Sequence, residues 1–501
     1  MRKKPSFKLE QILLAVIILG GIFLRLAKLD ENLFFSYEQG RDLLVVKKIS
    51  EGSLTLIGPR TSIEGIFHGL FYYYLMLPFY LIFSGNPLGV MTPFILFGAG
   101  CIWLSYLVGK TFFNSSVGII AALLFAVSSE AIVYSRWLSH PPLAIFFTLL
   151  LFLSVYKIIS GQSKFLILAV FAFALLFQTE IVAALFLLPA LLFILFLFKP
   201  EIKERKIKIF SFLLGLTLFS PYLLFDFRHQ FLMSKSFFRF LSSREEIYRF
   251  PIGETLRMIY GRYLDEFSLL VLPERKIFTG VLIVLIFLLL IIKIIKSGWF
   301  SKKEVGGKLL FYWLISVPLL GLFFWGGFHL KHYFVGVVPA MILGTAFLID
   351  RLIAKKALRL IGILLLIFLL LSNLSRWRNE LLVNREIFYL MTQKASLLGG
   401  EKKVIDYIYS EAGEEEFSWQ AFAIPYEMEH AWEYLFWQYG KRKYNYLPAH
   451  TSNRPGYFYL ILEPGGDQAY RLRWIENKIG QEKPIKKAEI DSILVQTYRR
   501  K

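Results

Sequence analysis

The chain of 501 residues contains one cysteine, Cys101, and this residue lies inside an apolar run. An intrachain disulfide and a multi-cysteine metal site are therefore excluded. The sequence also lacks a glycine-rich phosphate-binding loop, a recognisable Ser-His-Asp arrangement and a histidine–cysteine cluster with metal-binding spacing. These absences argue against P-loop enzymes, serine-triad hydrolases and zinc proteins.

Apolar residues, in contrast, are abundant. They make up 56% of the chain, which includes 50 phenylalanines, and the mean hydropathy is +0.54. A soluble core needs far less apolar surface, so this composition predicts a membrane protein with many spans. The formal net charge of +20 would suggest a nucleic-acid partner in a soluble chain. Here many of the Lys and Arg residues form short clusters between apolar runs, which reports orientation in a bilayer, and no nucleic-acid partner is expected.

Eleven apolar runs are about long enough to cross a bilayer. They cover residues 11–28, 88–109, 116–134, 141–158, 163–178, 180–198, 209–226, 277–295, 307–326, 333–350 and 356–373. A twelfth run, 66–84, would break the alternation of the basic clusters, which should all face the cytoplasm. Because it contains His68 and Pro78, we interpret it as an interfacial or re-entrant segment. The expected fold is an α-helical polytopic membrane protein with about eleven transmembrane helices.

The two ends of the chain are expected on opposite sides of the membrane. The first apolar run follows a basic segment, as in a signal peptide, but no clear cleavage site follows it, so we expect an uncleaved helix. Residues 1–373 are predicted to form the transmembrane domain, and residues 374–501 an extracytoplasmic α/β domain. In this tail we predict helices at about 399–411, 428–439 and 467–479, and strands at 417–424 and 457–462.

The most suggestive polar stretch runs from Phe34 to Asp42 and also contains Glu38 and Arg41. It follows the first apolar run, so two carboxylates and a guanidinium should lie close to a membrane surface. Charges are costly to hold there and are often functional. The alternative is an ordinary interfacial loop whose charges only stop a helix from sliding.

Other exterior segments supply further candidates for substrate binding. They are His68, Arg136, His140, Arg228, His229, Lys331, His332 and Tyr333. Taken singly, each has an explanation as an interfacial anchor, but their common side of the membrane favours a shared site. The segment 227–276 is also basic although we expect it outside, and an anionic phosphate ligand would explain this charge.

These residue types suit the transfer of a sugar from a lipid phosphate. A carboxylate would take the proton from an acceptor hydroxyl, while Arg, Lys and His would stabilise the departing phosphate. Glu38 and Asp42 could together hold a divalent ion, but hard cations want more oxygen ligands than the sequence offers. We therefore expect neither a metal nor another cofactor.

In layout, residues 9 to 373 resemble the type-C glycosyltransferases, within them the bacterial relatives of protein O-mannosyltransferases and aminoarabinose transferases. These multispan enzymes use polyprenyl-phosphate sugars. Members carry an acid, usually Asp followed by Glu or Gln, in the first exterior loop. The resemblance therefore implies that Glu38, followed by Gln39, is the catalytic base, with Asp42 beside it. The departure from Asp lengthens the base by one methylene.

The resemblance extends to two later segments. A family segment resembling Pro-Leu-Tyr is loosely matched from His68 to Tyr72, which makes His68 the candidate contact to the lipid phosphate. A late basic-Tyr-Phe segment resembles 331–334 and implies a role in donor binding. Many members have an Asp before Pro in the second exterior loop, where this chain has His140, so that second acid is absent.

The resemblance implies a hexosyl- or pentosyltransferase in the cell membrane, with its site on the outer face. Its partners would be a polyprenyl-phosphate sugar, membrane lipids and an acceptor glycan, lipid or protein. The alternative function is a lipid or polysaccharide transporter, although transporters typically place ionisable groups near mid-membrane. A non-enzymatic assembly protein would leave the converging polar loops unexplained.

Overall fold

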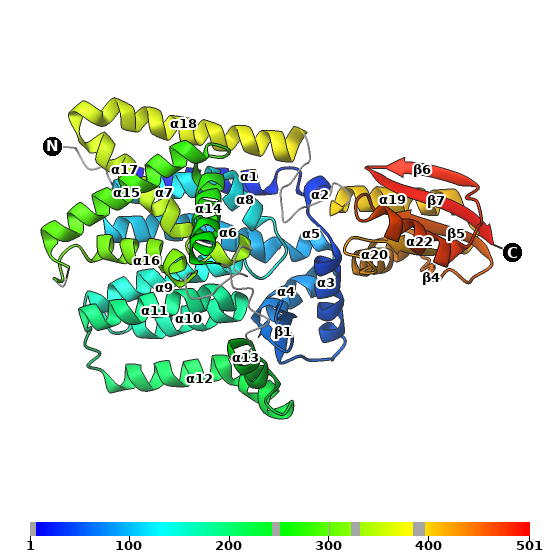
Figure 1. Ribbon diagram of the computed structural model, residues 1–501, viewed down its shortest axis with the longest axis horizontal. Helices are drawn as coiled ribbons and strands as arrows, with labels where there is room; N and C mark the ends of the chain where they lie inside the picture. The colour runs from blue at the N-terminus through cyan, green and yellow to red at the C-terminus, as the bar shows by residue number, and fades with distance from the viewer. Residues whose placement is uncertain (1–6, 243–250, 300, 322–330, 384–395, 501) are drawn as a thin grey trace.

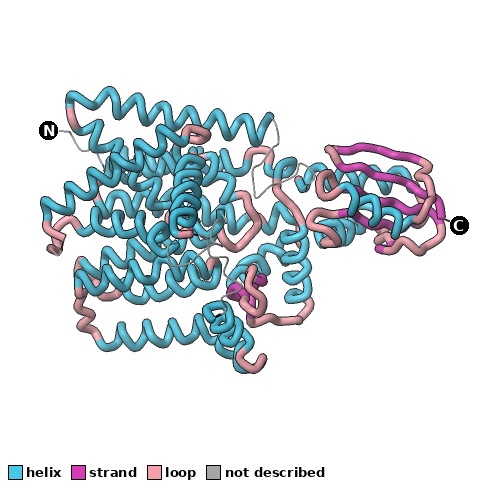
Figure 2. The backbone as a smooth tube through the Cα atoms, viewed as in Figure 1, coloured by secondary structure: helices cyan, strands magenta, loops and turns pink. Residues whose placement is uncertain are grey.

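The computed structural model describes residues 7–242, 251–299, 301–321, 331–383 and 396–500. Figure 1 shows a body of packed helices from which a smaller part with a β-sheet projects at one end. Within these ranges the long strands gather in that projecting part, while the body contains a short hairpin (Figure 2). The expected combination of a helical membrane part and a C-terminal α/β part is confirmed in outline.

The elements of the body follow one another with short connections. Its helices are α1 (Phe7–Leu26), α2 (Leu29–Asn32), α3 (Tyr37–Ser50), α4 (Phe71–Ile82), α5 (Pro87–Val90), α6 (Thr92–Phe112), α7 (Ser115–Val127), α8 (Ser129–Ser135), α9 (Leu143–Ile159), α10 (Phe165–Thr179), α11 (Ile181–Phe198), α12 (Arg205–Arg228), α13 (Leu232–Ser242), α14 (Ile252–Val271), α15 (Lys276–Ser297), α16 (Val305–Gly321), α17 (Val338–Ala354) and α18 (Arg359–Trp377). Shorter elements are β1 (Ile57–Arg60), β2 (Phe67–Gly69), η1 (Lys331–Phe334), η2 (Lys356–Leu358) and η3 (Arg378–Val383).

Six helices in the described part of the chain are long and apolar enough to cross a membrane, or seven if one bent pair counts as a span. The bent pair consists of α7 and α8, and the chain bends by 67° at the break between them. Shorter apolar helices include α4, α9 and α10. The protein is therefore a multi-pass helical membrane protein, but these lengths do not reach the predicted eleven full spans.

Two predicted runs differ from their expected form. The run 116–134 is not one straight helix, because Ser128 caps a new helix: its Oγ accepts from the Ala131 N–H at 3.3 Å and donates to the Leu270 carbonyl at 2.7 Å. The segment 227–276, expected as a loop, contains α13 and α14, and α14 packs against α15 and α17. The location of the segment 227–276 on the exterior side of the membrane remains a prediction.

The run 66–84 starts as a strand and continues as a helix. β2 pairs antiparallel with β1, with Ile57 opposite Gly69 and Arg60 opposite Phe67. α4 then spans only 12 residues. The helical part of the run 66–84 is thus too short for a full membrane span, in agreement with its interpretation as an interfacial or re-entrant segment.

The C-terminal part is a five-stranded mixed sheet in the order β4-β3-β5-β7-β6. Its strands are β3 (Phe417–Phe422), β4 (Ala449–His450), β5 (Gly456–Leu462), β6 (Lys486–Ile490) and β7 (Ile493–Arg500). Its helical elements are α19 (Leu398–Ala412), α20 (His430–Leu435), η5 (Phe436–Gly440), α21 (Lys441–Tyr444) and α22 (Gln468–Ile479). The elements predicted in the tail are all present, whereas β4, β6 and β7 were not predicted. The domain boundary after residue 373 stays a prediction.

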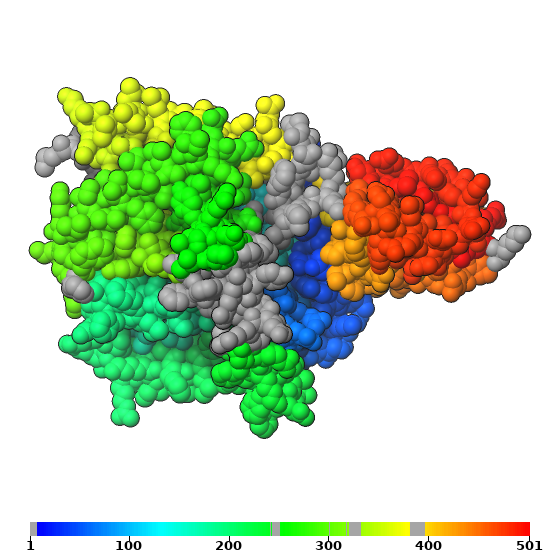
Figure 3. All heavy atoms as spheres, in the orientation of Figure 1, coloured from blue at the N-terminus to red at the C-terminus, as the bar shows by residue number. Residues whose placement is uncertain are grey.

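The sheet-bearing part is docked on the chain that follows α1. The Phe35 N–H donates to the Ser396 carbonyl at 2.8 Å, and the Leu398 N–H donates to the Leu33 carbonyl at 2.9 Å. The Tyr434 hydroxyl donates to the Gly85 carbonyl at 2.5 Å. In the space-filling view the orange C-terminal residues lie directly against blue N-terminal ones (Figure 3). This contact helps to fix α3, which carries Glu38.

Candidate active site

The start of α3 is defined by local sequence. Ser36 is the N-cap, and the Gln39 side-chain oxygen accepts from the Ser36 N–H at 3.0 Å and from its hydroxyl at 2.9 Å. The Gln39 amide nitrogen then donates to the Leu138 carbonyl at 3.1 Å. Because Leu138 precedes His140 by two residues, this contact ties the acidic helix to the second predicted exterior loop.

Asp42 and Arg41 form a close pair on α3. Arg41 donates to the Asp42 Oδ1 from Nε at 2.9 Å and approaches it from an outer nitrogen at 2.8 Å. The Tyr73 hydroxyl donates to the same oxygen at 3.2 Å. Burial raises the pKa of Asp42 to about 6, although the neighbouring Arg41 opposes this shift. Asp42 is thus engaged in holding Arg41 and Tyr73.

Glu38 lies one helical turn before Asp42 and is in a more open position. Its side chain is partly buried, and Oε1 accepts from the Tyr37 hydroxyl at 3.1 Å. The other carboxylate oxygen keeps acceptor capacity for a substrate proton. Of the two predicted acids, Glu38 is therefore better placed to act as a base, and Asp42 is better placed to orient its neighbours.

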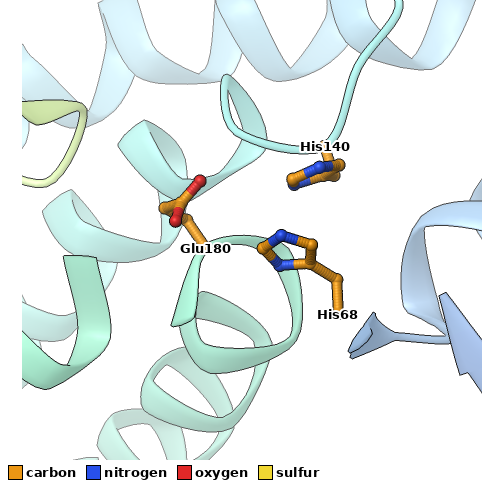
Figure 4. A group of neighbouring side chains, drawn as sticks. All are labelled: His68, His140 and Glu180. Atoms are coloured by element: carbon orange, nitrogen blue, oxygen red, sulfur yellow. The ribbon is translucent and has the colours of Figure 1, made fainter. Parts of the chain in front are cut away.

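Two predicted histidines meet in the interior beside this helix. The rings of His68 and His140 have centroids 3.9 Å apart and are inclined by 37°. Glu180 joins them, and the candidate ligand atoms of the three residues all lie within 4.8 Å of one another. Figure 4 shows these side chains gathered from three separate segments. The sequence offered no metal-type spacing, and the fold creates such a cluster.

Neighbouring polar groups hold the segments of this cluster in place. The pKa of His140 is lowered to about 3, mainly by burial and further by the charges of His332 and Arg41. The hydrogen bond with the Thr179 carbonyl opposes this shift. His140 Nδ1 lies 2.6 Å from that carbonyl, so it carries a proton and donates. A Cβ added at Gly69 would lie 2.3 Å from Gln178 Cγ, so the strand of His68 needs glycine to approach α10.

The late predicted segment reaches the same region. His332 and Tyr333 belong to η1, and Tyr333 is only 8% exposed. Burial lowers the pKa of His332 to about 4. Lys331 begins η1, but its side chain lies outside the described residues. The structure therefore brings Arg41, Asp42, His68, His140 and His332 into one neighbourhood.

Three other candidates do not join this neighbourhood. Arg136 is 1% exposed and donates to the carbonyls of Ala27 at 2.9 Å and Lys28 at 3.3 Å, so it caps the end of α1. In this structure the guanidinium is engaged by backbone, and a role of Arg136 in substrate binding stays a prediction. Arg228 and His229 are exposed at the end of α12, where His229 stacks on its own helix.

Sequence reasoning missed the roles of Glu180, Tyr73 and Gln39. Glu180 directly follows Thr179, at the junction of the two predicted apolar runs 163–178 and 180–198. That position was the available signal for it. Tyr73 lies in the run 66–84, and sequence spacing alone does not show that its hydroxyl meets Asp42.

The fold as a whole is similar to that of known membrane proteins. The crystal structure of ArnT from Cupriavidus metallidurans bound to undecaprenyl phosphate superposes with a TM-score of 0.58, at 9% identity and with 97% of each chain covered. The same protein in the apo state gives a TM-score of 0.58 at 10% identity, again with 97% of each chain covered. The similarity shows an ArnT-like fold for nearly the whole chain.

Sequence comparison finds a match to a family model over a shorter segment. Residues 67–225 match the family model described as dolichyl-phosphate-mannose-protein mannosyltransferase. A protein from Bacillus subtilis strain 168 named as a mannosyltransferase, YkcB, is 32% identical over 133 residues, or 26% of this chain and 19% of that protein. The aligned part thus spans about a fifth of that relative. The predicted resemblance is confirmed, and His68, His140 and Glu180 all lie within the matched segment.

Proposed function

We propose that this protein is a membrane glycosyltransferase that moves a sugar from a polyprenyl-phosphate donor to an acceptor hydroxyl. The observation that carries the proposal is the meeting of Glu38 with the Arg41–Asp42 pair beside buried histidines. The ArnT-like fold supports it, since that relative was crystallised with undecaprenyl phosphate. The mannosyltransferase family match supports the class of reaction.

In the proposed reaction Glu38 takes the proton of the acceptor hydroxyl as its oxygen attacks the anomeric carbon. A new carbon–oxygen bond forms, and the bond from that carbon to the donor phosphate oxygen breaks. The bonding electrons leave with the lipid phosphate, whose negative charge grows. Arg41, which is fixed by Asp42, stabilises this charge, with His332 as a further donor.

The proposal also includes a sidedness. The site, the segment 227–276 and the C-terminal part would face the exterior, and the chain would cross the membrane eleven times. Labelling intact cells from outside, in a Cys101→Ser background, should modify Asn453→Cys and leave Lys203→Cys unmodified. Both side chains are exposed in the structure, so a difference in labelling would report the side of the membrane rather than burial within the protein. Labelling of Lys203→Cys would reject the eleven-span arrangement.

The activity itself can be tested with purified protein in proteoliposomes. A panel of polyprenyl-phosphate hexoses and pentoses is supplied with acceptor candidates, and the release of free polyprenyl phosphate is measured. We expect release with at least one donor. Movement of an intact labelled donor across the bilayer, with no release from any donor, would instead identify a transporter and reject the proposal.

A further inference from the structure

We propose that His68, His140 and Glu180 form a binding site for one divalent transition-metal ion, with Zn²⁺ as its occupant. The three candidate ligand atoms lie within 4.8 Å of one another, which is close enough for one ion to contact all of them after small side-chain adjustments. Figure 4 shows that they come from separate segments, so the site exists only in the folded chain. The inference is independent of sugar transfer.

The cluster contains polar atoms for which the described residues supply no hydrogen-bond partner. His68 is 6% exposed and Glu180 is 1% exposed. Among the described residues, His68 Nδ1 and Glu180 Oε2 are buried without a hydrogen bond. Buried polar atoms are nearly always satisfied in folded proteins. An ion held by these atoms would remove the deficit at both.

His140 is oriented in the way that metal-binding histidines usually are. Its Nδ1 donates to the Thr179 carbonyl at 2.6 Å, which leaves Nε2 without a proton and ready to bind a metal. Thr179 directly precedes Glu180, so one turn of chain positions both a ligand and the carbonyl that orients another ligand. Such a backbone partner sets both the tautomer and the direction of the ring.

The ligand types select the class of ion. Two imidazole nitrogens and one carboxylate suit Zn²⁺ and similar first-row metals, whereas Mg²⁺ and Ca²⁺ prefer shells of oxygen ligands. Three protein ligands leave a tetrahedral zinc with one position for water or an anion. This site differs from the divalent-ion site considered between Glu38 and Asp42, because it lies on other segments and includes nitrogen ligands.

Positive charge nearby does not prevent binding. Arg41 is close enough to influence His68, but its own charge is balanced by Asp42 at 2.8 Å. Glu180 contributes a carboxylate, which is close enough to Tyr333 to influence its hydroxyl. The local balance is therefore compatible with a divalent cation that binds two neutral histidines and one carboxylate.

The test measures metal rather than turnover. Full-length protein, purified in detergent on a tag without histidines and stripped with EDTA, is titrated with Zn²⁺ and its metal content is measured after gel filtration. We expect one Zn²⁺ per chain. Loss of a ligand in Glu180→Gln or His140→Ala should weaken binding by more than the 10- to 100-fold that is typical of losing a second-shell partner. Co²⁺ added in place of Zn²⁺ should show visible absorption without a thiolate band, since Cys101 is not a ligand.

His229→Ala is the matched control, because this histidine is exposed on α12 and lies outside the cluster. It should bind Zn²⁺ as the unmodified protein does. If Glu180→Gln fails to elute as a single folded species, His68→Gln replaces it. An unmodified protein that takes up no Zn²⁺ overturns the proposal by itself, and so does equal loss of Zn²⁺ in His229→Ala. Either result would leave the sugar-transfer proposal standing.

Discussion

Two clusters of buried polar side chains lie in the helical body, and they differ in how fully they are satisfied. One surrounds Arg25 and Arg376 and joins α1, α8 and α18. The other contains His68, His140 and Glu180. Both place ionisable groups away from water, which is costly unless partners are supplied.

The first cluster supplies its own partners. Arg25 donates to the Ser135 hydroxyl at 2.9 Å and to the Gly21 and Ala126 carbonyls at 2.9 and 3.1 Å. Arg376 pairs with Glu380 at 2.7 Å and with Glu130 at 3.3 Å. Since these guanidiniums are used by neighbouring segments, their role is to hold the helices together.

The second cluster leaves acceptor and donor capacity unused among the described residues. Backbone engages two of its groups, since His140 Nδ1 donates to the Thr179 carbonyl and the Glu180 carboxylate accepts from the Val182 backbone. The comparison teaches that burial of charge does not by itself mark a functional site in this protein. The useful sign is burial without sufficient protein partners, and variants can test whether the two clusters separate stability from activity.

The largest expected effect comes from Glu38→Gln, on the open side of the candidate site. The amide keeps the shape of the side chain but cannot accept a proton, so sugar transfer should fall by about 10²- to 10⁴-fold. Thermal stability should change little, because Glu38 is only partly buried. Initial rates at saturating donor, together with a thermal melt, measure both quantities.

Glu51→Gln is the control for this variant, because Glu51 caps the other end of α3 and pairs with Lys47 on the surface. We expect near-normal transfer, since an exposed pair contributes only about 0–1 kcal/mol. Near-normal turnover in Glu38→Gln would show that Glu38 is not the base. Asp42 would then be the next residue to examine.

The opposite pattern is expected for Arg376→Gln in the satisfied cluster. It removes the 3.3 Å partner of the buried Glu130, and breaking a buried ion pair costs about 3–5 kcal/mol. Thermal stability in detergent should drop clearly, and the activity of the fraction that stays folded should be near normal. Arg359→Gln, an exposed position on the same helix, should melt like the parent. A stable but inactive Arg376→Gln protein would erase the distinction between the two clusters.

Much of the membrane part followed from sequence because apolar runs and basic clusters report position in a bilayer directly. The same reasoning placed Arg41, Asp42, His68 and His140 on one face, and the structure brings them together. The sequence could not show that Arg136 caps α1, because that role depends on where a helix 109 residues earlier ends. The sequence shows that Arg136 is a cation, but it does not show which groups the guanidinium contacts.

Other features depend on contacts between distant segments. The break between α7 and α8 is supported by the Ser128 hydroxyl bonding to Leu270, 142 residues away. Glu180 is far in sequence from His68 and His140, and only folding brings the two histidines beside it. In the tail, β6 was missed because Lys486–Ile490 is mostly polar, whereas β7 begins with the apolar run Ile493–Val495, a signal that could have revealed it.

A smaller effect is expected at the contact between α3 and the C-terminal part. A Cβ at Gly40 would lie 2.4 Å from the His430 carbonyl oxygen, so Gly40→Ala must push α3 away from α20. Overpacking of this kind typically costs about 1–3 kcal/mol, and a shift of about 1 Å in a catalytic element can slow turnover by up to about 10²-fold. We expect slower transfer, measured as initial rate. The control is Gly261→Ala, which has open space around its Cβ and should retain activity. Equal rates in both variants would show that the contact between α3 and α20 does not affect catalysis.

The smallest expected effect concerns the pH dependence of Asp42, a satisfied residue inside the otherwise open site. Burial raises its pKa to about 6, so below that pH it becomes neutral and no longer balances Arg41. Transfer should therefore fall as the pH drops below 6 and level off at the lower rate of the protein with a neutral Asp42. Stability should follow the opposite course: because the folded-state pKa is above the ordinary value near 3.9, the stabilisation is present at low pH and is lost as pH rises through about 6.

Asp42→Asn separates these trends from those of the other groups near it, which are Glu38, Arg41 and Tyr73. The amide cannot titrate, so both the acid limb of the rate profile and the matching change in stability should disappear, with a smaller loss of rate at pH 7 than in Glu38→Gln. Rates and melting temperatures from pH 5 to 8 provide the measurement. If the acid limb persists in Asp42→Asn, its origin lies in another group, and Asp42 serves only to hold the helix in place.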